Sequence, residues 1–264
     1  MRLDPDRWRP PVAIAHRGSR LLWPENTMVA FEGATELGYR HLETDLHVTA
    51  DGVVVCIHDP TVDRTTNGRG PVERFTFDEL SKLDAGYRHH GPSGYGFRES
   101  GAQVPSLEEV VSKFPEASFV VDMKADSVVQ PLASLIRRLE LEERLIVGAF
   151  SDDRLEMFRQ ASGGGVATST GPALTRLWVI ASRMGRGAGG AAQALQVPTQ
   201  IRGVRIVDQK LIEAAHETGL QVHVWTVNDR YEMERLLDLG VDGVVTDRID
   251  VLKEVLAERG EWPK

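Results

Sequence analysis

The sequence predicts an α/β protein, a TIM (β/α)8 barrel, and three observations lead to this prediction. Short apolar runs rich in β-branched residues alternate with amphipathic stretches along the chain, as in a parallel sheet covered by helices. Eight such strand-and-helix units fit into 264 residues, a common size for one barrel. No Gly-rich dinucleotide-binding turn follows the first apolar run, which disfavours a doubly wound open sheet.

The elements follow from this alternation in chain order. The expected strands are Val12–His16, His41–Leu46, Ser118–Met123, Leu145–Ala149, Gly165–Ser169, Ala192–Val197, Gln221–Thr226 and Asp242–Thr246. The expected helices are Thr27–Leu37, Ser106–Lys113, Ser127–Leu139, Asp152–Gln160, Pro172–Met184, Asp208–Thr218, Asp229–Leu239 and Arg248–Arg259. Ser106, Ser151 and Asp208 are suited to cap helix N-termini, and glycines such as Gly219 and Gly240 are suited to end helices.

One segment departs from a plain barrel. Asp51-Gly52 lies between the second strand and another apolar run, Val53–Ile57, which indicates a hairpin that overhangs the barrel. With the turn centred there, His58 returns beside Asp45 or one residue pair away, near Glu43.

A long insertion follows the hairpin, over residues 60–104 approximately. It is rich in Gly, Arg and Thr, and its apolar periodicity is too weak for a separate domain. We therefore expect one domain over residues 1–264, with the insertion as a loop or small lid at one side of the barrel mouth.

Composition excludes several classes of protein. The formal net charge is −8 and no run of Lys and Arg interrupts it, so a general nucleic-acid-binding role is not expected. No apolar stretch is long enough to span a membrane, and Met1–Pro11 does not resemble a secretory signal. The lone Cys56 excludes an internal disulfide. We expect a soluble cytoplasmic protein, and the sequence leaves its oligomeric state open.

Carboxylates near the predicted strand ends indicate a metal site. Glu43 and Asp45 are two residues apart on one strand, so both side chains face the barrel interior. Adjacent carboxylates raise each other's pKa unless a cation neutralises them, and a divalent ion with oxygen ligands, Mg²⁺ or Ca²⁺ with Mn²⁺ also possible, suits this pair. Asp122 ends another strand and is a candidate third ligand.

Cations and histidines accompany these carboxylates. Arg17 offers a bidentate fork for a phosphate, and Lys124 offers a point charge for an anionic oxygen. His16 and His58 are candidates for a general acid and base pair. The pattern predicts a cationic, metal-containing pocket in an acidic protein.

These residues together resemble the signature of a known family. The matching motifs are His16-Arg17-Gly18, Pro24-Glu25-Asn26-Thr27, Glu43-Thr44-Asp45, His58-Asp59, Asp122-Met123-Lys124, Trp225-Thr226-Val227-Asn228 and Asp242-Gly243-Val244-Val245-Thr246-Asp247. They resemble the glycerophosphodiester phosphodiesterase family in order and over nearly the whole chain.

The resemblance implies a TIM barrel that hydrolyses glycerophosphodiesters to glycerol 3-phosphate and an alcohol, through a cyclic phosphate. It also implies a role for each residue. The implied roles are metal binding by Glu43, Asp45 and Asp122, acid–base catalysis by His16 and His58, phosphate binding by Arg17 and Lys124, and lining of the substrate pocket by Trp225. Many family members have Glu at the position of Asp122, whose shorter side chain must reach the metal from farther back or through a water.

Several residues keep two interpretations. Glu25 and Asn26 either contact the metal or substrate, or Asn26 caps the following helix. Asp59 either orients His58 or begins a turn, and Trp225 either lines the pocket or fills the core. Asp247 is interpreted as a helix cap. The remaining candidate is His223, two residues before Trp225 on the same strand, which is expected to face the same interior.

Two further functions stay open at this point. A lysophospholipase D needs an apolar route for an acyl chain, and Leu21–Trp23 together with Leu177–Ile180 are candidates for it. A non-catalytic barrel that binds a phosphorylated ligand is disfavoured because His16, Glu43, Asp45 and His58 are all present.

Overall fold

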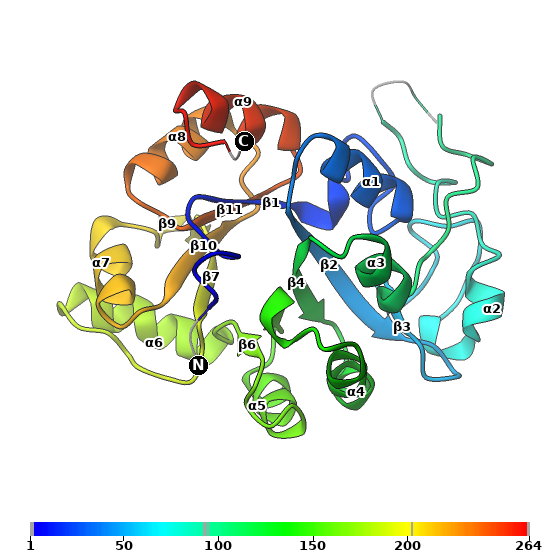
Figure 1. The fold of residues 1–264 in the computed structure, drawn as a ribbon, viewed down its shortest axis with the longest axis horizontal. Helices are drawn as coiled ribbons and strands as arrows, with labels where there is room; N and C mark the ends of the chain where they lie inside the picture. Colours follow the sequence, from blue (N-terminus) through cyan, green and yellow to red (C-terminus); the bar gives the residue numbers. More distant parts are fainter. Residues whose placement is uncertain (1–2, 92–93, 95, 202, 263–264) are drawn as a thin grey trace.

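Eight parallel strands form a nearly closed barrel in the computed structural model, which describes residues 3–91, 94, 96–201 and 203–262 (Figure 1). The strands are β1 (Val12–Ala15), β2 (His41–Val48), β4 (Ser118–Met123), β5 (Leu145–Gly148), β6 (Ala167–Thr168), β7 (Ala194–Pro198), β10 (Gln221–Trp225) and β11 (Gly243–Thr246). They run in chain order around the sheet, with β11 beside β1. The circle closes where Thr170 N donates to Ala194 O at 3.0 Å. The predicted TIM barrel is therefore confirmed.

Helices surround this barrel, as the amphipathic stretches predict. They are α1 (Met28–Glu36), α3 (Leu107–Lys113), α4 (Val129–Leu139), α5 (Asp152–Ala161), α6 (Pro172–Arg183), α7 (Gln209–Glu217), α8 (Arg230–Asp238) and α9 (Ile249–Glu258). A short helix that the sequence did not predict, α2 (Phe77–Leu80), lies in the insertion. The predicted caps are confirmed, because the side chains of Ser106, Ser151 and Asp208 each accept a hydrogen bond from the first turn of their helix. None of the described helices has the length and apolar character needed to cross a membrane.

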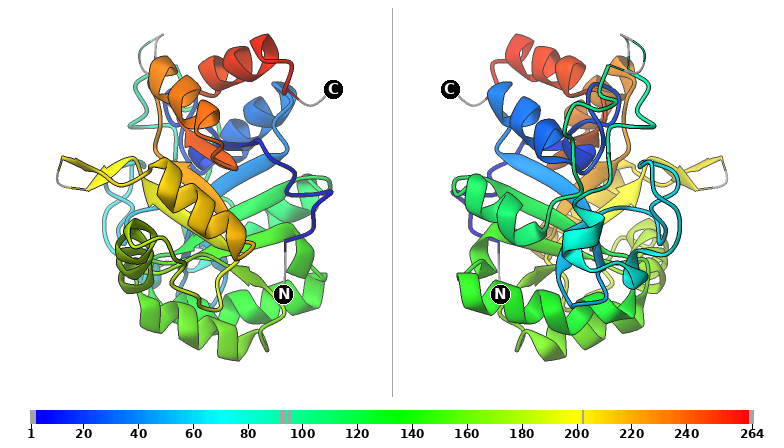
Figure 2. Two further views of the ribbon diagram at one scale, coloured as in Figure 1. Left: turned by 90° about the vertical axis from the view of Figure 1, so that its left-hand side faces the viewer. Right: turned by 90° about the vertical axis from the view of Figure 1, so that its right-hand side faces the viewer.

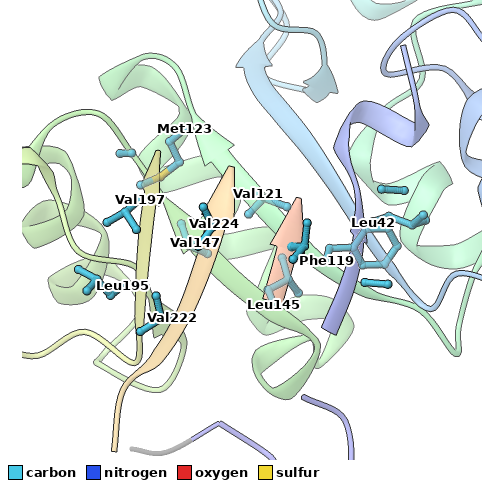
Figure 3. Packing of buried hydrophobic residues seen from close by; sticks show 14 of the residues in the cluster. Leu42, Phe119, Val121, Met123, Leu145, Val147, Leu195, Val197, Val222 and Val224 are labelled. Carbon is cyan, nitrogen blue, oxygen red and sulfur yellow. The ribbon is translucent and has the colours of Figure 1, made fainter. Parts of the chain in front are cut away.

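Strand side chains alternate between the barrel interior and the helix layer. On β4, Phe119, Val121 and Met123 belong to the large core between sheet and helices, shown in Figure 3. The alternate residue Val120 belongs to a smaller cluster inside the barrel. Asp122 has the same parity as Val120, so its carboxylate points into the barrel near the strand end.

The base of the barrel is closed by a residue that precedes the first strand. Trp8 is fully buried in the interior cluster. Its ring lies 5.0 Å from the His41 ring and 6.3 Å from the His223 ring, measured between centroids. His223 faces the interior, as predicted, but at the base and not at the mouth.

The predicted hairpin after β2 is also confirmed. Strand β3 (Val54–Cys56) pairs antiparallel with β2, in the register Leu46 with Cys56 and Val48 with Val54. Ile57 N then donates to Asp45 O at 2.9 Å, so His58 lies one residue past the position opposite Asp45. This placement is within the range that the turn predicts.

The insertion forms a small layer beside the hairpin. Its apolar side chains build a separate cluster with Val55 and Ile57, and it includes α2 and the 3-10 helix η2 (Val72–Arg74). Residues 92, 93 and 95 of the insertion lie outside the described residues. The single-domain prediction over residues 1–264 stays a prediction.

A second, smaller hairpin follows β7. Strands β8 (Gln200–Ile201) and β9 (Val204–Arg205) pair antiparallel outside the barrel sheet. Figure 2 shows this hairpin projecting from the body of the molecule in both views.

Candidate active site

A cavity of about 960 Å³ opens at the carboxyl ends of the barrel strands. One side is charged, and the other combines apolar side chains with mostly uncharged polar ones. The charged side is lined by His16, Arg17, Arg20, Glu43, Asp45, His58, Asp122 and Lys124. The other side is lined by Val120, Gly148, Ala149, Phe150, Ser169, Thr170, Pro172, Thr175, Arg176, Gln196, Pro198, Ile201, Trp225, Thr226 and Val245. The cavity thus joins all eight catalytic, metal-binding and substrate-binding residues predicted from sequence.

A strained turn after β1 positions the first two of these residues. Arg17 has φ 52° and Gly18 has φ 75°, both in the left-handed region. A Cβ at Gly18 would lie 2.7 Å from the backbone carbon of Ala30, so only glycine permits this approach to α1. The turn directs Arg17 N to Glu43 Oε2 at 3.0 Å. The left-handed backbone of Arg17 stores strain on the order of 1–3 kcal/mol, which is typical of functional sites.

His16 is held by a carboxylate from the last strand–helix connection. Its Nδ1 lies 2.7 Å from Oδ1 of the buried Asp247, and its Nε2 lies 3.9 Å from Glu43 Oε2. Burial would lower the pKa of His16, but the charge of Glu43 and the hydrogen bond to Asp247 raise it above 6.5. Because Nδ1 is engaged by Asp247, Nε2 is the nitrogen on the cavity side.

The helix-cap prediction for Asp247 is wrong. The residue at the N-cap position of α9 is Arg248, and Asp247 instead contacts Arg20 Nε at 3.0 Å and Asn228 Nδ2 at 2.9 Å. Burial would raise the pKa of Asp247, but hydrogen bonds from His16 and Asn228 lower it to about 2. The carboxylate is therefore ionised and keeps a proton on His16 Nδ1.

His58 has an equivalent partner. Its Nδ1 lies 2.6 Å from Asp59 Oδ1, and Arg64 from the insertion donates to both oxygens of Asp59. The hydrogen bonds from Arg64 lower the pKa of Asp59 to about 2. Of the two interpretations of Asp59, the structure favours orientation of His58.

Three carboxylates lie on the inner face of neighbouring strands. Asp45 of β2 is directly in register with Asp122 of β4, and Glu43 lies two residues before Asp45. Lys124 Nζ bridges the pair, 2.7 Å from Asp45 Oδ1 and 2.5 Å from Asp122 Oδ2. Arg17 Nε lies 2.9 Å from Asp45 Oδ2. Burial and the charge of Asp45 raise the pKa of Glu43 to about 7.

Glu25 and Asn26 both approach this cluster. Arg17 and Arg64 both donate to Glu25 Oε1, at 2.9 and 2.8 Å. Asn26 Nδ2 donates to Asp45 Oδ2 at 3.0 Å. Thr27, not Asn26, caps α1, through a hydrogen bond from Ala30 N. Asn26 thus orients Asp45, and the cap alternative is wrong.

The carboxylates suit a divalent metal in their chemistry. Burial and the charge of Asp45 raise the pKa of Glu43, and Asp122 Oδ1 is buried without a hydrogen-bond partner among the described residues, so a bound cation would stabilise both carboxylates. In the described part of the chain, however, no three acidic, histidine or cysteine side chains converge closely enough to hold a metal as positioned. Lys124 and Arg17 form ion pairs with Asp45 instead. Metal binding would therefore require these cations to change partners.

Aromatic side chains stand on the other side of the cavity. The rings of Trp225 and Phe150 meet edge to face at 5.6 Å between centroids, and Lys124 Nζ lies 5.6 Å from the Phe150 centroid. Trp225 also packs against the interior cluster of the barrel. It therefore serves both interpretations, as part of the pocket wall and as part of the core.

Asp247, Asn228, Arg20 and Arg64 are the site residues that the sequence interpretation missed. Asp247 and Asn228 belong to the quoted motifs and each follows a barrel strand. Because parallel strand ends meet at one rim, this position could have identified both as site residues. Arg20 and Arg64 have no comparable signal.

Comparisons with known proteins identify the family of this chain. Residues 16–251 match the model of the glycerophosphoryl diester phosphodiesterase family. A protein named "Probable glycerophosphodiester phosphodiesterase 2" from Mycobacterium tuberculosis is 33% identical over 257 residues, covering 95% of this chain and 92% of that protein. The glycerophosphodiester phosphodiesterase of Caldanaerobacter subterraneus subsp. tengcongensis is 33% identical, covering 94% and 99%. The chain belongs to the glycerophosphoryl diester phosphodiesterase family.

Solved structures agree with the fold. The crystal structure of glycerophosphodiester phosphodiesterase from Agrobacterium tumefaciens has a TM-score of 0.73 and 27% identity, covering 91% of this chain and 98% of that one. An Oleispira antarctica phosphodiesterase, solved in complex with its product sn-glycerol-3-phosphate, has a TM-score of 0.75 and 21% identity, covering 94% and 97%.

A lysophospholipase D of Rattus norvegicus is 26% identical, covering 92% of this chain and 85% of that protein.

Proposed function

We propose that the protein hydrolyses glycerophosphodiesters to glycerol 3-phosphate and an alcohol, with His16 and His58 as the acid–base pair. The observation that carries this proposal is the pair of His–Asp contacts at the mouth of the barrel. In each, an ionised aspartate holds Nδ1, which leaves Nε2 for proton exchange with substrate. Two such imidazoles suit a reaction that needs one proton removed and another delivered.

The substrate supplies the nucleophile in this proposal. Its glycerol 2-hydroxyl is tethered close to phosphorus and has a high effective molarity. As its oxygen attacks phosphorus, one histidine takes the hydroxyl proton, the bond from phosphorus to the alcohol oxygen breaks, and the other histidine protonates the departing oxygen. Water then opens the cyclic phosphate with the two histidine roles reversed, which yields glycerol 3-phosphate.

The charged side of the cavity assists each step. We propose that Arg17 and Lys124 bind the phosphate oxygens and that Glu43, Asp45 and Asp122 hold one divalent ion, Mg²⁺, Ca²⁺ or Mn²⁺. Such an ion supplies Lewis acidity toward a phosphoryl oxygen. Asn26 and Glu25 keep Asp45 and Arg17 in place, and Trp225 lines the wall that faces the leaving alcohol. The lone Cys56 is buried and needs no oxidising environment, which supports a cytoplasmic location.

A deoxy substrate tests the mechanism. A glycerophosphodiester whose 2-hydroxyl is replaced by hydrogen should bind but turn over at least about 10³-fold more slowly, because the tethered nucleophile is missing. Binding is measured as competitive inhibition of glycerophosphocholine hydrolysis. Normal turnover of the deoxy compound would show that water attacks directly.

Lysophospholipase D activity is the second candidate, and the apolar side of the cavity favours it. The segments Leu21–Trp23 and Leu177–Ile180, suggested as a route for the acyl chain, do not line the cavity. Phe150, Pro198 and Ile201 provide an apolar wall instead. We expect kcat/KM for glycerophosphocholine to exceed that for lysophosphatidylcholine. A tenfold preference for the acylated compound, about 1.4 kcal/mol in transition-state binding, would establish the second candidate.

A further inference from the structure

An exposed surface beside the cavity combines aliphatic side chains with arginines. We call it the basic–apolar patch; it consists of Arg176, Leu177, Ile180 and Arg183 of α6, of Met184 directly after this helix, and of Ile201, Val204 and Arg205 of the β8–β9 hairpin. Its five aliphatic side chains are each between 42% and 59% exposed. These side chains account for five of the nine large hydrophobic residues exposed in the described part of the chain. Such a concentration indicates an interaction surface.

The two elements form one continuous surface. Arg183, the last residue of α6, donates to Arg205 O of β9 at 3.4 Å, which links the end of the helix to the hairpin. Ile201 and Val204 are cross-strand partners. Arg176 and Ile201 also line the cavity, so the patch continues to the rim of the active site. Figure 2 shows the hairpin standing out from the body of the protein on this side.

The charge of the patch is opposite to that of the protein. Residues 157–207 contain six arginines and no Asp or Glu, whereas a segment of that length would hold about seven acidic residues at the chain's average. Within the described residues, Arg176, Arg183 and Arg205 form no ion pair; Arg176 and Arg183 donate only to backbone carbonyls. Glu232 of α8 interacts electrostatically with Arg205, but it is itself paired with Arg235. The patch keeps its positive charge.

We infer that the basic–apolar patch docks the protein on an anionic lipid surface, with Ile180, Met184 and Val204 in the interface and the arginines among the headgroups. Exposed aliphatic side chains flanked by arginines are the composition of peripheral membrane contacts. A nucleic acid would use the charges but not the aliphatic side chains, whereas a bilayer interface uses both. The choice of lipid over an acidic protein rests on the proposed function, because the patch borders a cavity for phospholipid-derived diesters.

Vesicle sedimentation tests this inference. Wild-type protein is mixed with vesicles of phosphatidylcholine alone or of equal parts phosphatidylcholine and phosphatidylglycerol, at low and high salt. The variant Ile180→Ser/Arg183→Glu/Met184→Ser alters the patch without touching a cavity residue. Arg74→Glu/Met157→Ser changes an exposed arginine and an exposed methionine elsewhere, as a matched control. The single change Arg183→Glu is the milder variant, should the triple variant fold poorly.

We expect binding to phosphatidylglycerol vesicles that high salt weakens, and little binding to phosphatidylcholine alone. The triple variant should bind at least about tenfold more weakly and Arg183→Glu at least about fivefold more weakly, as expected for lost surface charge. The control should match the wild type. Absence of wild-type binding, or equal binding by the triple variant, would overturn the inference. A wild-type dimer that the triple variant converts to monomer would also overturn it, because a second copy would then cover the patch.

A separate measurement distinguishes this inference from the proposed function. All variants are assayed on soluble glycerophosphocholine, which needs no membrane, and should retain wild-type kcat. If the wild type binds vesicles but does not hydrolyse this compound, the proposed function fails and the docking surface stands.

Discussion

The two ends of the barrel hold histidines in opposite environments. At the base, His41 contacts Arg7 O and His223 contacts Gln221 Oε1, and burial lowers their pKa values to about 4 and about 3. At the mouth, His16 is also buried, yet its pKa is raised because Asp247 and Glu43 stabilise the charged form. The difference teaches that a carboxylate partner, more than burial, decides whether a barrel histidine exchanges protons near neutral pH.

Metal removal should have the largest effect on activity at the mouth of the barrel. Chelation should abolish hydrolysis of glycerophosphocholine, and added Mg²⁺, Ca²⁺ or Mn²⁺ should restore it, because the proposed ion supplies Lewis acidity toward a phosphoryl oxygen. Glu43→Gln should weaken metal binding, measured by calorimetry, without unfolding the barrel. Full activity after exhaustive metal removal would contradict the assignment of Glu43, Asp45 and Asp122.

Replacement of a histidine should lower kcat at the mouth of the barrel but not at its base. His16→Ala and His58→Ala should each lower kcat by about 10²–10⁴, the usual contribution of a general acid or base. His223→Leu at the base should leave kcat within about threefold, since His223 does not reach the cavity. Steady-state kinetics with circular dichroism checks both. Equal losses at mouth and base would mean that the variants act through folding.

A smaller loss is expected when only the partner of a histidine changes. Asp247→Asn keeps the shape of the side chain but removes the charge that holds His16 Nδ1, and kcat should fall by about 10–10³. KM should stay within about twofold, because Asp247 does not line the cavity. A rise in KM with constant kcat would assign Asp247 to the pocket structure and not to the orientation of His16.

The buried histidine His223 at the bottom of the barrel should affect how the free energy of unfolding depends on pH. The folded-state pKa of His223 is about 3, below the unfolded value of about 6.5. Its stabilising contribution is therefore complete above pH 6.5 and is lost as the pH falls toward 3, because only the unfolded state binds the proton.

His223→Leu should reduce the slope of the free energy of unfolding against pH by up to about 1.4 kcal/mol per pH unit. The free energy of unfolding is measured with urea between pH 4.5 and 7. An unchanged slope would show that burial does not lower the pKa of His223 in the folded protein.

The sequence by itself determined the elements and one side of the site. Alternation of apolar runs predicted all eight barrel strands, and Asp51-Gly52 predicted the hairpin that brings His58 to the mouth. Spacing of two residues placed Glu43 and Asp45 on one face. These features are local, since the strand period of two and the helix period of 3.6 act within a few residues.

Only the tertiary structure decided which distant residues meet. His16 and Asp247 are 231 residues apart and come together because β1 pairs with β11 in the register Ala15 with Thr246. Trp8 closes the base because the chain before β1 folds under the barrel. The basic–apolar patch likewise needs α6 and the β8–β9 hairpin side by side. Barrel closure sets all these contacts, and a sequence pattern states the period of a strand but not the register of its partner.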